Sequence, residues 1–340
     1  MKTITKTAAL ALLLFNFCAG INAGAQTTNA PQLKHTYKVN SNGGWDYLTV
    51  DHEHNRLYIS HATQVNVLNE KTGDSVGVIA NTPGVHGIAL VSSLNKGYTS
   101  NGKAGECTVF DMKSLSTIGK IKVGENPDAI FYDDFSKKVF VFNGKSMNVS
   151  VIDPAKDVVI ATLALGGKPE TGVSDGKGNI YVNIEDKNEV VCFRAINPEI
   201  IKRFKLEGAE EPSGLAIDRI NSRLFIGCSN NVLLILDAKT GKKINVLPIG
   251  AESDGVVFDP ALKLIYSANG EGTLSVIKEI SSNDFRPFET VKTAVGARTI
   301  TLDYTTHHVF LPTADFKPGT AEGKRRSSVP GTFRVLEFGW

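Results

Sequence analysis

Ionisable side chains recur at one position of a long-period pattern in this 340-residue chain. Successive members of the set lie 40 to 44 residues apart: Asp46, His86, Asp128, Glu170, Ser213, Asp254 and Arg298. A charge withdrawn from bulk water must be solvated, paired or bound to a ligand. If the fold gathers these residues, they could hold a metal ion, bind a polar ligand, or pair with one another around bound water.

A second set follows each member of the first by 13 or 15 residues and is rich in asparagine. It consists of His61, Asn101, Asn143, Asn183, Cys228, Asn269 and Thr313. Asparagine tolerates left-handed backbone and caps turns, and three of these asparagines precede glycine, which is ordinary turn chemistry. Their amide oxygens could also act as ligands. The residues alone leave both interpretations open.

Two metal chemistries fit these side chains. A hard cation such as Ca²⁺ prefers about six to eight oxygen ligands. The carboxylates that could provide them are Asp46, Asp128, Glu170 and Asp254. A softer metal would use His61, His86 and Cys228, which come from three different repeats. In a metal-dependent hydrolase the ion would polarise an ester carbonyl or activate water, and His86 or His61 would move the proton.

Non-covalent binding is the function we favour over catalysis. Arg298 would clamp a carboxylate or phosphate, and Trp45 would stack on the ligand unless it only packs against other blades. The candidate ligand-binding residues are Trp45, Asp46, His86, Asp128, Asn143, Glu170, Asn183, Asp254, Asn269 and Arg298. A protein partner covering the same face is the other form of this hypothesis.

A repeating four-stranded unit must position both sets. In the most regular copy, β-branched and aromatic runs at 129–132, 138–142, 148–152 and 158–164 are separated by turn formers. The end of the first run recurs in steps of 40 to 44 residues, at Asp51, Val91, Asp133, Asp175, Asp218, Asp259 and Asp303. Seven such units predict an all-β fold, a seven-bladed β-propeller with four antiparallel strands per blade and small residues on the innermost strands.

The last unit is one strand short, which predicts how the ring closes. Its runs lie at 299–302, 308–312 and 332–338, and residues 35–39 can supply the missing outer strand. We expect a single domain over residues 35–340, after a flexible segment at 26–34. The insertion at residues 316–331, with the cluster Lys324-Arg325-Arg326, would form a lid, a partner-binding loop or a solvated tip at the channel mouth.

The segments VFVFNGKSMNVSVID and NIYVNIEDKNEVVCF share an aromatic-Val-x-Asn strand end, a short loop and alternating valines. They resemble the YVTN repeat of the YncE-like β-propeller family, and looser copies extend the resemblance over the mature chain. The resemblance implies seven blades in an exported bacterial protein. It implies no single reaction, because a fold does not fix a function. Metal-dependent lactonases on propeller scaffolds are similar in placing carboxylate and Asn ligands at this mouth.

Residues 1–25 are predicted to be a secretory signal. Its features are the basic residues Lys2 and Lys6, an apolar run at 8–17 and the cleavage site Ala23-Gly24-Ala25. Lipidation at Cys18 is the weaker interpretation, because Phe17 is too bulky before a lipidated cysteine. The mature chain would begin at Gln26, in the periplasm or outside the cell. No other apolar run reaches ~18 residues, so no membrane span is expected.

Charge and cysteine usage exclude several function classes. Lys and Arg number 37 against 35 Asp and Glu, and removal of Lys2 and Lys6 would leave 35 of each. A neutral chain has no global field for nucleic acid, which is not an expected partner. Cys107, Cys192 and Cys228 form no C-x-x-C motif, and Cys107 and Cys192 fit core positions. A redox-partner subunit is the third functional alternative, and we expect a monomer.

Overall fold

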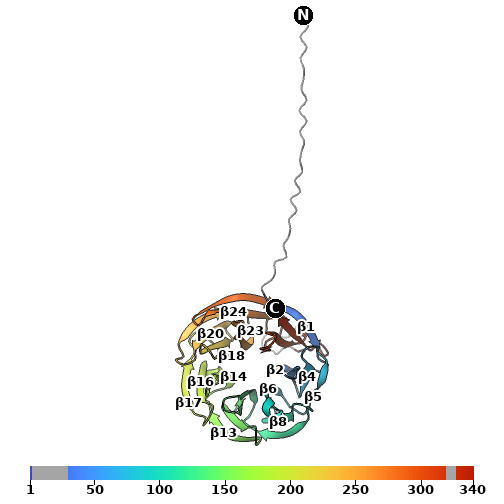
Figure 1. The fold of residues 1–340 in the computed structure, drawn as a ribbon, viewed down its shortest axis with the longest axis vertical. Coiled ribbons are helices and arrows are strands. Elements are labelled where there is room, and N and C mark those ends of the chain that lie inside the picture. Colours follow the sequence, from blue (N-terminus) through green and yellow to red (C-terminus); the bar gives the residue numbers. More distant parts are fainter. Residues whose placement is uncertain (2–29, 319–326) are drawn as a thin grey trace.

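Seven four-stranded antiparallel sheets surround a central axis in the computed structural model, which describes residue 1 and residues 30–318 and 327–340 (Figure 1). The predicted all-β propeller with seven blades is confirmed. Blades 1 to 3 comprise β2(Trp45–Asp51), β3(Arg56–His61), β4(Gln64–Asn69) and β5(Ser75–Ile79); β6(Val85–Val91), β7(Lys96–Asn101), β8(Glu106–Asp111) and β9(Thr117–Lys122); and β10(Pro127–Asp133), β11(Lys138–Asn143), β12(Asn148–Asp153) and β13(Val158–Ala164).

The remaining four blades continue the same order around the axis. They comprise β14(Pro169–Ser174), β15(Asn179–Ile184), β16(Glu189–Arg194) and β17(Ile200–Lys205); β18(Pro212–Asp218), β19(Arg223–Cys228), β20(Val232–Asp237) and β21(Lys243–Pro248); β22(Ser253–Asp259), β23(Leu264–Asn269), β24(Thr273–Ser281) and β25(Asp284–Lys292); and β26(Thr301–Leu302), β27(Val309–Thr313), β28(Arg334–Gly339) and β1(Gln32–Lys38). Among the described residues, the 3₁₀ turns η1(Ser92–Leu94) and η2(Glu185–Lys187) connect β6 to β7 and β15 to β16. Within the described residues no helix has the length and apolarity needed to cross a membrane.

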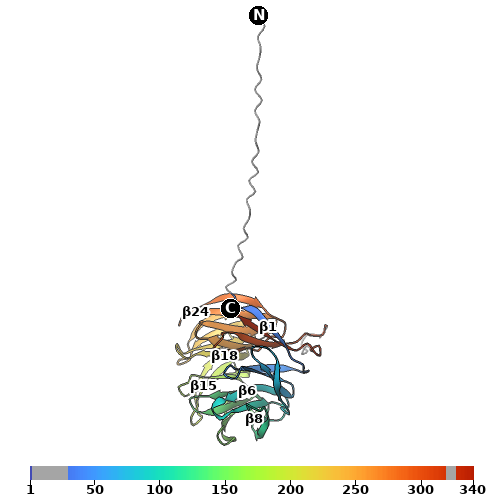
Figure 2. The same cartoon turned by 45° about the vertical axis from the view of Figure 1, so that its right-hand side comes forward.

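The N-terminal strand closes the last blade, as predicted. β1 pairs antiparallel with β28, from Gln32 opposite Gly339 to Lys38 opposite Arg334. Figures 1 and 2 both show β1 beside the C-terminal end of the chain. The strand begins at Gln32 rather than at residue 35, so it includes the end of the segment predicted to be flexible. The predicted signal sequence and Cys18 lie outside the described residues, apart from Met1.

The apolar core is divided among the spaces between blades. Seven clusters of buried side chains each join two neighbouring blades, so every blade is held by both neighbours. The innermost strands approach closely: a Cβ on Gly214 would lie 2.8 Å from Val256 N, and one on Gly255 would lie 2.9 Å from Ile300 N. The small residues predicted on these strands are therefore required by the close approach of adjacent backbones.

The aspartates that mark the repeat lie at the end of an innermost strand or directly after it. Their side chains cap the turn that follows. Asp133 Oδ2 accepts from Ser136 N (2.9 Å), Asp259 Oδ1 from Ala261 N (2.9 Å), and Asp303 Oδ1 from Thr305 N (2.9 Å). An Asp side chain can satisfy turn donors that have no strand partner, which explains why this residue recurs.

Candidate binding site at the channel mouth

A β-bulge near the start of the innermost strands positions the first predicted set of side chains. Asp46, His86, Asp128, Glu170, Ser213 and Asp254 are each the second residue of their strand, and the register shifts there in all six blades. A bulge bends the strand and re-aims side chains. Arg298 comes just before β26 and its carbonyl accepts a hydrogen bond from Gly255 N. We call these seven residues the mouth ring.

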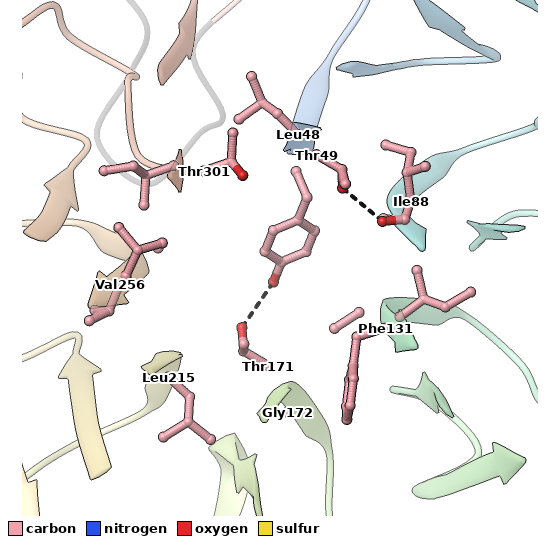
Figure 3. Close-up of a pocket in the computed structure, with 16 residues that line it drawn as sticks. Leu48, Thr49, Ile88, Phe131, Thr171, Gly172, Leu215, Val256 and Thr301 are labelled. Carbon is pink, nitrogen blue, oxygen red and sulfur yellow. Dashed lines mark hydrogen bonds between the residues drawn. The ribbon is translucent and has the colours of Figure 1, made fainter. Parts of the chain in front are cut away.

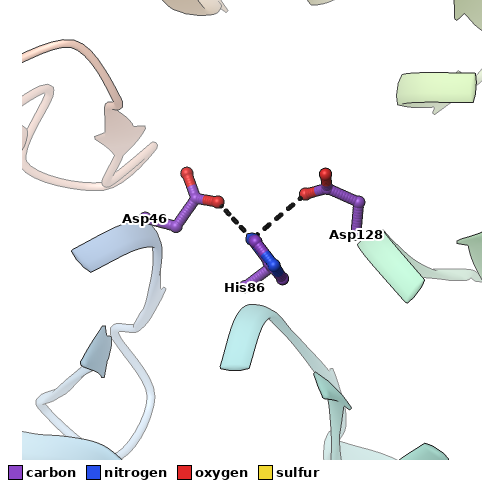
Figure 4. A group of neighbouring side chains, drawn as sticks. All are labelled: Asp46, His86 and Asp128. Carbon is purple, nitrogen blue, oxygen red and sulfur yellow. Dashed lines mark hydrogen bonds and ion pairs between the residues drawn. The ribbon is translucent and has the colours of Figure 1, made fainter. Parts of the chain in front are cut away.

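His86 joins two aspartates of neighbouring blades (Figure 4). Its Nδ1 donates to Asp46 Oδ2 at 2.6 Å and lies 3.4 Å from Asp128 Oδ1. Burial alone would lower the pKa of His86, but the hydrogen bond to Asp46 and the charges of Asp128, Asp46 and Glu170 outweigh burial and raise it to about 9. His86 is therefore an imidazolium at neutral pH, held between two carboxylates.

Arg298 continues this chain of charges on the other side of Asp46. Its Nε lies 3.0 Å from Asp254 Oδ2, and its Nη2 lies 3.7 Å from Asp46 Oδ1. The hydroxyl of Ser213 donates to Asp254 Oδ1. Six of the seven mouth-ring residues thus form one connected series, from Asp128 through His86, Asp46, Arg298 and Asp254 to Ser213. Because Arg298 is already engaged by two aspartates, it is not a free clamp for an anionic ligand.

Glu170 completes the ring but belongs to a separate ion pair. Its Oε1 lies 2.7 Å from Lys168 Nζ, and Lys168 also pairs with Glu185. Burial and the charge of Asp128 raise the pKa of Glu170 to about 8 despite Lys168. Burial and the charge of Asp46 similarly raise the pKa of Asp128 to about 7 despite His86, and burial raises the pKa of Asp254 despite Arg298. At Asp128, Glu170 and Asp254 the neighbouring cations therefore do not offset burial and the repulsion between carboxylates.

The geometry brings together part of the metal set predicted from sequence. Single ligand atoms of Asp46, His86 and Asp128 all lie within 4.8 Å of one another. Among the described residues, Glu170 and Asp254 do not join that group. Three such ligands could hold a divalent cation that accepts nitrogen as well as oxygen, whereas Ca²⁺ would need further oxygen ligands.

The asparagines of the second set point into the blades rather than into the mouth. Asn101, Asn143, Asn183 and Asn269 are fully buried. Asn143 Nδ2 donates to Ser150 Oγ (3.0 Å), Asn101 Nδ2 to Thr108 Oγ1 (2.8 Å), and Asn269 Nδ2 to Ser275 Oγ (2.9 Å). Asn183 Nδ2 instead bonds the carbonyls of Ser213 and Gly214 in the next blade. These amide groups therefore form hydrogen bonds within their own blade or to the next blade.

Trp45 and His61 also belong to the packing between blades. The ring of Trp45 lies 5.3 Å from that of Phe333 and 5.9 Å from that of Phe316. His61 stacks on Phe333 with centroids 4.0 Å apart, and its two ring nitrogens contact Ser41 Oγ and the carbonyl of Gly43. Burial lowers the pKa of His61. Since both nitrogens are engaged, His61 is not positioned as a proton shuttle beside His86.

A cavity of about 300 Å³ lies along the channel below the mouth ring, lined by residues from all seven blades (Figure 3). Its lining side chains are mostly apolar, with hydroxyls at Thr49, Thr171 and Thr301, but polar atoms make up nearly half of the exposed wall. Tyr47 of blade 1 reaches Thr171 of blade 4, with the two side-chain oxygens 3.4 Å apart. Burial and the ring carboxylates raise the pKa of Tyr47, which stays neutral. Sequence reasoning missed Tyr47, although the residue directly follows Asp46 and shares the inner strand.

The described cysteines have no feature of a redox site. Cys107, Cys192 and Cys228 are free thiols and are buried. Burial raises the pKa of Cys192 to about 11 and that of Cys228 to about 12, so neither is a thiolate at neutral pH. Cys107 and Cys192 lie in the core, as the sequence indicated. Cys228 is also in the core, so it is not available with His61 and His86 as a soft-metal ligand.

The insertion between β27 and β28 is described only at its base. Phe316 and Ser328 form an isolated antiparallel bridge, and Lys317 N donates to Ser327 O at 2.9 Å. The insertion therefore interrupts the last blade at the predicted place. Its cluster Lys324-Arg325-Arg326 lies outside the described residues.

Comparison with known proteins supports the fold and nothing narrower. No family model and no curated protein matches the chain. Two solved structures are similar: the structure of U3-55K, with a TM-score of 0.73 and 8% identity over 90% of this chain and 99% of that one, and the crystal structure of the RRP9 WD40 repeats, with a TM-score of 0.73 and 8% identity over 91% and 100%. At this identity the likeness establishes a seven-bladed propeller of the WD40-like architecture.

Proposed function

We propose that the protein is a binding scaffold whose mouth ring takes up a cationic group carried by a small ligand or by a protein partner. The observation that carries this proposal is the imbalance of charge in the ring. Four carboxylates face His86, Arg298 and a Lys168 that Glu170 shares with Glu185, and the pKa values of Asp128 and Glu170 are still raised to about 7 and about 8. A cation placed beside them would remove this repulsion.

The cavity below the mouth ring could hold the part of the ligand that does not carry the positive charge. The cavity of about 300 Å³ has a wall of mixed apolar and polar surface, and Tyr47 is one of its lining residues, near enough to the carboxylates for their charges to raise its pKa. An amine or guanidinium would meet Asp128 and Glu170, while an aliphatic chain could extend toward Phe131 and Ile130. Propellers commonly present such a mouth to small molecules or to a side chain of a partner protein.

Isothermal titration calorimetry with spermidine as the cationic probe tests this proposal. Wild-type protein should bind spermidine with proton release at pH 7.5, because the cation lowers the pKa values of Asp128 and Glu170. Asp128→Asn and Glu170→Gln should each weaken binding about tenfold, equivalent to ~1.4 kcal/mol. Glu289→Gln, at an exposed site on β25, is the matched control. Equal affinities for wild type and both mouth variants would refute the proposal.

A metal-dependent hydrolase is the second candidate, favoured by the cluster of Asp46, His86 and Asp128 within 4.8 Å. These residues would hold a divalent ion that polarises an ester or lactone carbonyl. Glu170, with its raised pKa of about 8, would take the proton from the attacking water in its ionised form, which predominates only above about pH 8; the sequence had suggested His86 or His61 for this role. Metal analysis of the purified protein, followed by lactone hydrolysis with and without chelator, tests this alternative.

We further infer that the chain is an exported, monomeric member of the YncE-like family. The YVTN-like segments coincide with β11–β12 and β15–β16, and residues 1–25 have the composition of a secretory signal. Expression with the native N-terminus, followed by N-terminal sequencing of the processed protein, should give Gln26 as the first residue. Retention of Met1 in a cytoplasmic fraction would contradict export. Size-exclusion chromatography with light scattering would test the monomer.

A further inference from the structure

A second cluster of potential metal ligands lies far from the mouth, where the last blade meets the first. His52 follows β2, Glu70 follows β4, and Asp303 follows β26. The innermost strands begin at the mouth ring, so residues after their ends lie on the opposite face. We call these three residues the seam triad, because two come from blade 1 and one from blade 7. No function proposed for the mouth uses them.

The distances within the seam triad suit one small metal ion. His52 Nδ1 lies 3.0 Å from Asp303 Oδ2 and 3.6 Å from Glu70 Oε2, and all three ligand atoms lie within 4.8 Å of one another. Ligands bound to Zn²⁺ at about 2.0–2.2 Å in a tetrahedron are ~3.3 Å apart. The side chain of His52 is 35% exposed, which leaves a path from solvent and room for a water molecule as fourth ligand.

An unsatisfied carboxylate oxygen points into this cluster. Glu70 is 4% exposed, and its Oε2 has no hydrogen-bond donor among the described residues. His52 Nδ1 likewise makes no hydrogen bond of acceptable geometry there, although Asp303 is close. A buried carboxylate oxygen without a donor or cation is costly. Both atoms would be satisfied by the same bound cation.

The repeat itself shows that Glu70 is exceptional. In five blades the residue at this position donates its backbone N–H to the turn before the second strand, as Glu70 does to Asn55 O, whereas in blade 3 the position is a proline, which has no N–H. The equivalent residues of blades 2 to 5 are Met112, Pro154, Ala195 and Ala238. Only Glu279 of blade 6 is also acidic, and its Oε1 accepts from Asn221 Nδ2 at 3.0 Å. Glu70 therefore has a carboxyl group that packing does not require.

Neighbouring groups hold the seam triad in place. The hydroxyl of Thr306 donates to Asp303 Oδ2 at 2.6 Å, and Thr305 N donates to Oδ1 at 2.9 Å. The hydroxyl of Tyr37 on β1 donates to the backbone carbonyl of Glu70 at 2.9 Å. Hydrogen bonds of this kind orient metal ligands and restrict their motion.

We propose that the seam triad binds one divalent transition-metal ion of the class represented by Zn²⁺. The ion joins His52 and Glu70 of blade 1 to Asp303 of blade 7, and so fastens the ring closure that β1 and β28 make by strand pairing. One histidine and two carboxylates with a water molecule are a ligand set that Zn²⁺ accepts. The role of the ion is structural, since it locks the two ends of the ring together.

The test uses tag-free, full-length folded protein treated with chelator and then titrated with Zn²⁺. Calorimetry should show a bound Zn²⁺ that is lost in both Glu70→Gln and His52→Ala, and Zn²⁺ at about 100 times its Kd should raise the Tm by about 4 °C. His52→Ala alters a partly exposed side chain and keeps the test valid if Glu70→Gln fails to fold. Co²⁺ should give the intense visible absorption of a tetrahedral site in wild type only.

Two control variants separate this site from the other acidic positions. Glu279→Gln changes the equivalent buried glutamate of blade 6 and should keep the Zn²⁺-dependent rise in Tm. Asp128→Asn removes a ligand candidate of the mouth and should keep it as well. The proposal is overturned if wild type binds no Zn²⁺, which would leave Glu70 and Asp303 to share a proton, or if the rise in Tm is lost with Asp128→Asn and kept with Glu70→Gln.

Discussion

The mouth ring and the neighbouring asparagines recur at the same interval, yet they differ in burial and in how their polar groups are satisfied. Asp46, His86 and Asp128 are partly exposed and meet charges from other blades. Asn143 and Asn269 are fully buried and bond hydroxyls on the next strand of their own blade. A polar residue repeated at a fixed position can therefore serve either a site or the fold, and its partners decide which.

The largest effect on stability is expected at Arg298, a mouth-ring residue that also stabilises the fold. Arg298→Met would leave Asp46 and Asp254 facing each other without their shared cation, and we expect a loss of about 2–3 kcal/mol in the free energy of unfolding. Arg286→Met is the control, because Arg286 pairs with Asp284 at the exposed surface, where such pairs contribute little to stability. Denaturant unfolding of both variants measures the difference. Equal losses would mean that the ring charges are as well solvated as the surface.

Substitutions of the buried asparagines of the second set should cause a smaller loss of stability and no loss of ligand binding. Asn269→Ala removes hydrogen bonds with Ser267, Thr273 and Ser275 and leaves these hydroxyls buried, at a cost of about 2 kcal/mol. Spermidine affinity at the mouth should stay within twofold of wild type. A loss of affinity comparable to that of Glu170→Gln would instead place the asparagine in the site and remove the distinction between the two sets.

The fold was largely predictable from sequence because each repeat contains its own strands and turns. The repeat period and the number of strands per repeat follow from residues that act locally. The closure by an N-terminal strand follows from the last repeat being one strand short. The hydroxyl partners of the asparagines were not predicted: the sequence suggested turn chemistry or ligand oxygens, whereas Asn143 and Asn101 donate to Ser150 and Thr108 on the next strand. The bulges were not readable, because they depend on pairing between strands. They determine which side chains converge, so the Asp46–His86–Asp128 grouping and the role of Tyr47 emerged only in three dimensions.

The pH dependence of stability gives a third comparison, between Glu170 in the mouth ring and an exposed glutamate, and its expected effect is of intermediate size. The pKa of Glu170 is raised to about 8, so between about pH 4.5 and pH 8 the folded protein keeps a proton that the unfolded chain has lost. This contribution to stability is therefore lost as the pH rises through that window. Glu170→Gln cannot ionise and should show a smaller fall in Tm from pH 5 to pH 8, whereas the exposed control Glu289→Gln should match wild type. A steeper fall in Glu170→Gln would contradict the proposed crowding of carboxylates.

The smallest effect on stability is expected at Tyr47, which lines the cavity below the charged mouth. Its hydroxyl lies 3.4 Å from Thr171 Oγ1, which is long for a hydrogen bond between hydroxyls, so Tyr47→Phe should change the free energy of unfolding by less than ~0.5 kcal/mol. Tyr47→Ala, by contrast, would join the cavity of about 300 Å³ to the mouth. A longer probe, such as an alkylated polyamine, should then gain affinity over spermidine in Tyr47→Ala but not in Tyr47→Phe. If both variants leave the preference between the two probes unchanged, the cavity below Tyr47 is not part of the binding site, and recognition at the mouth depends on charge alone.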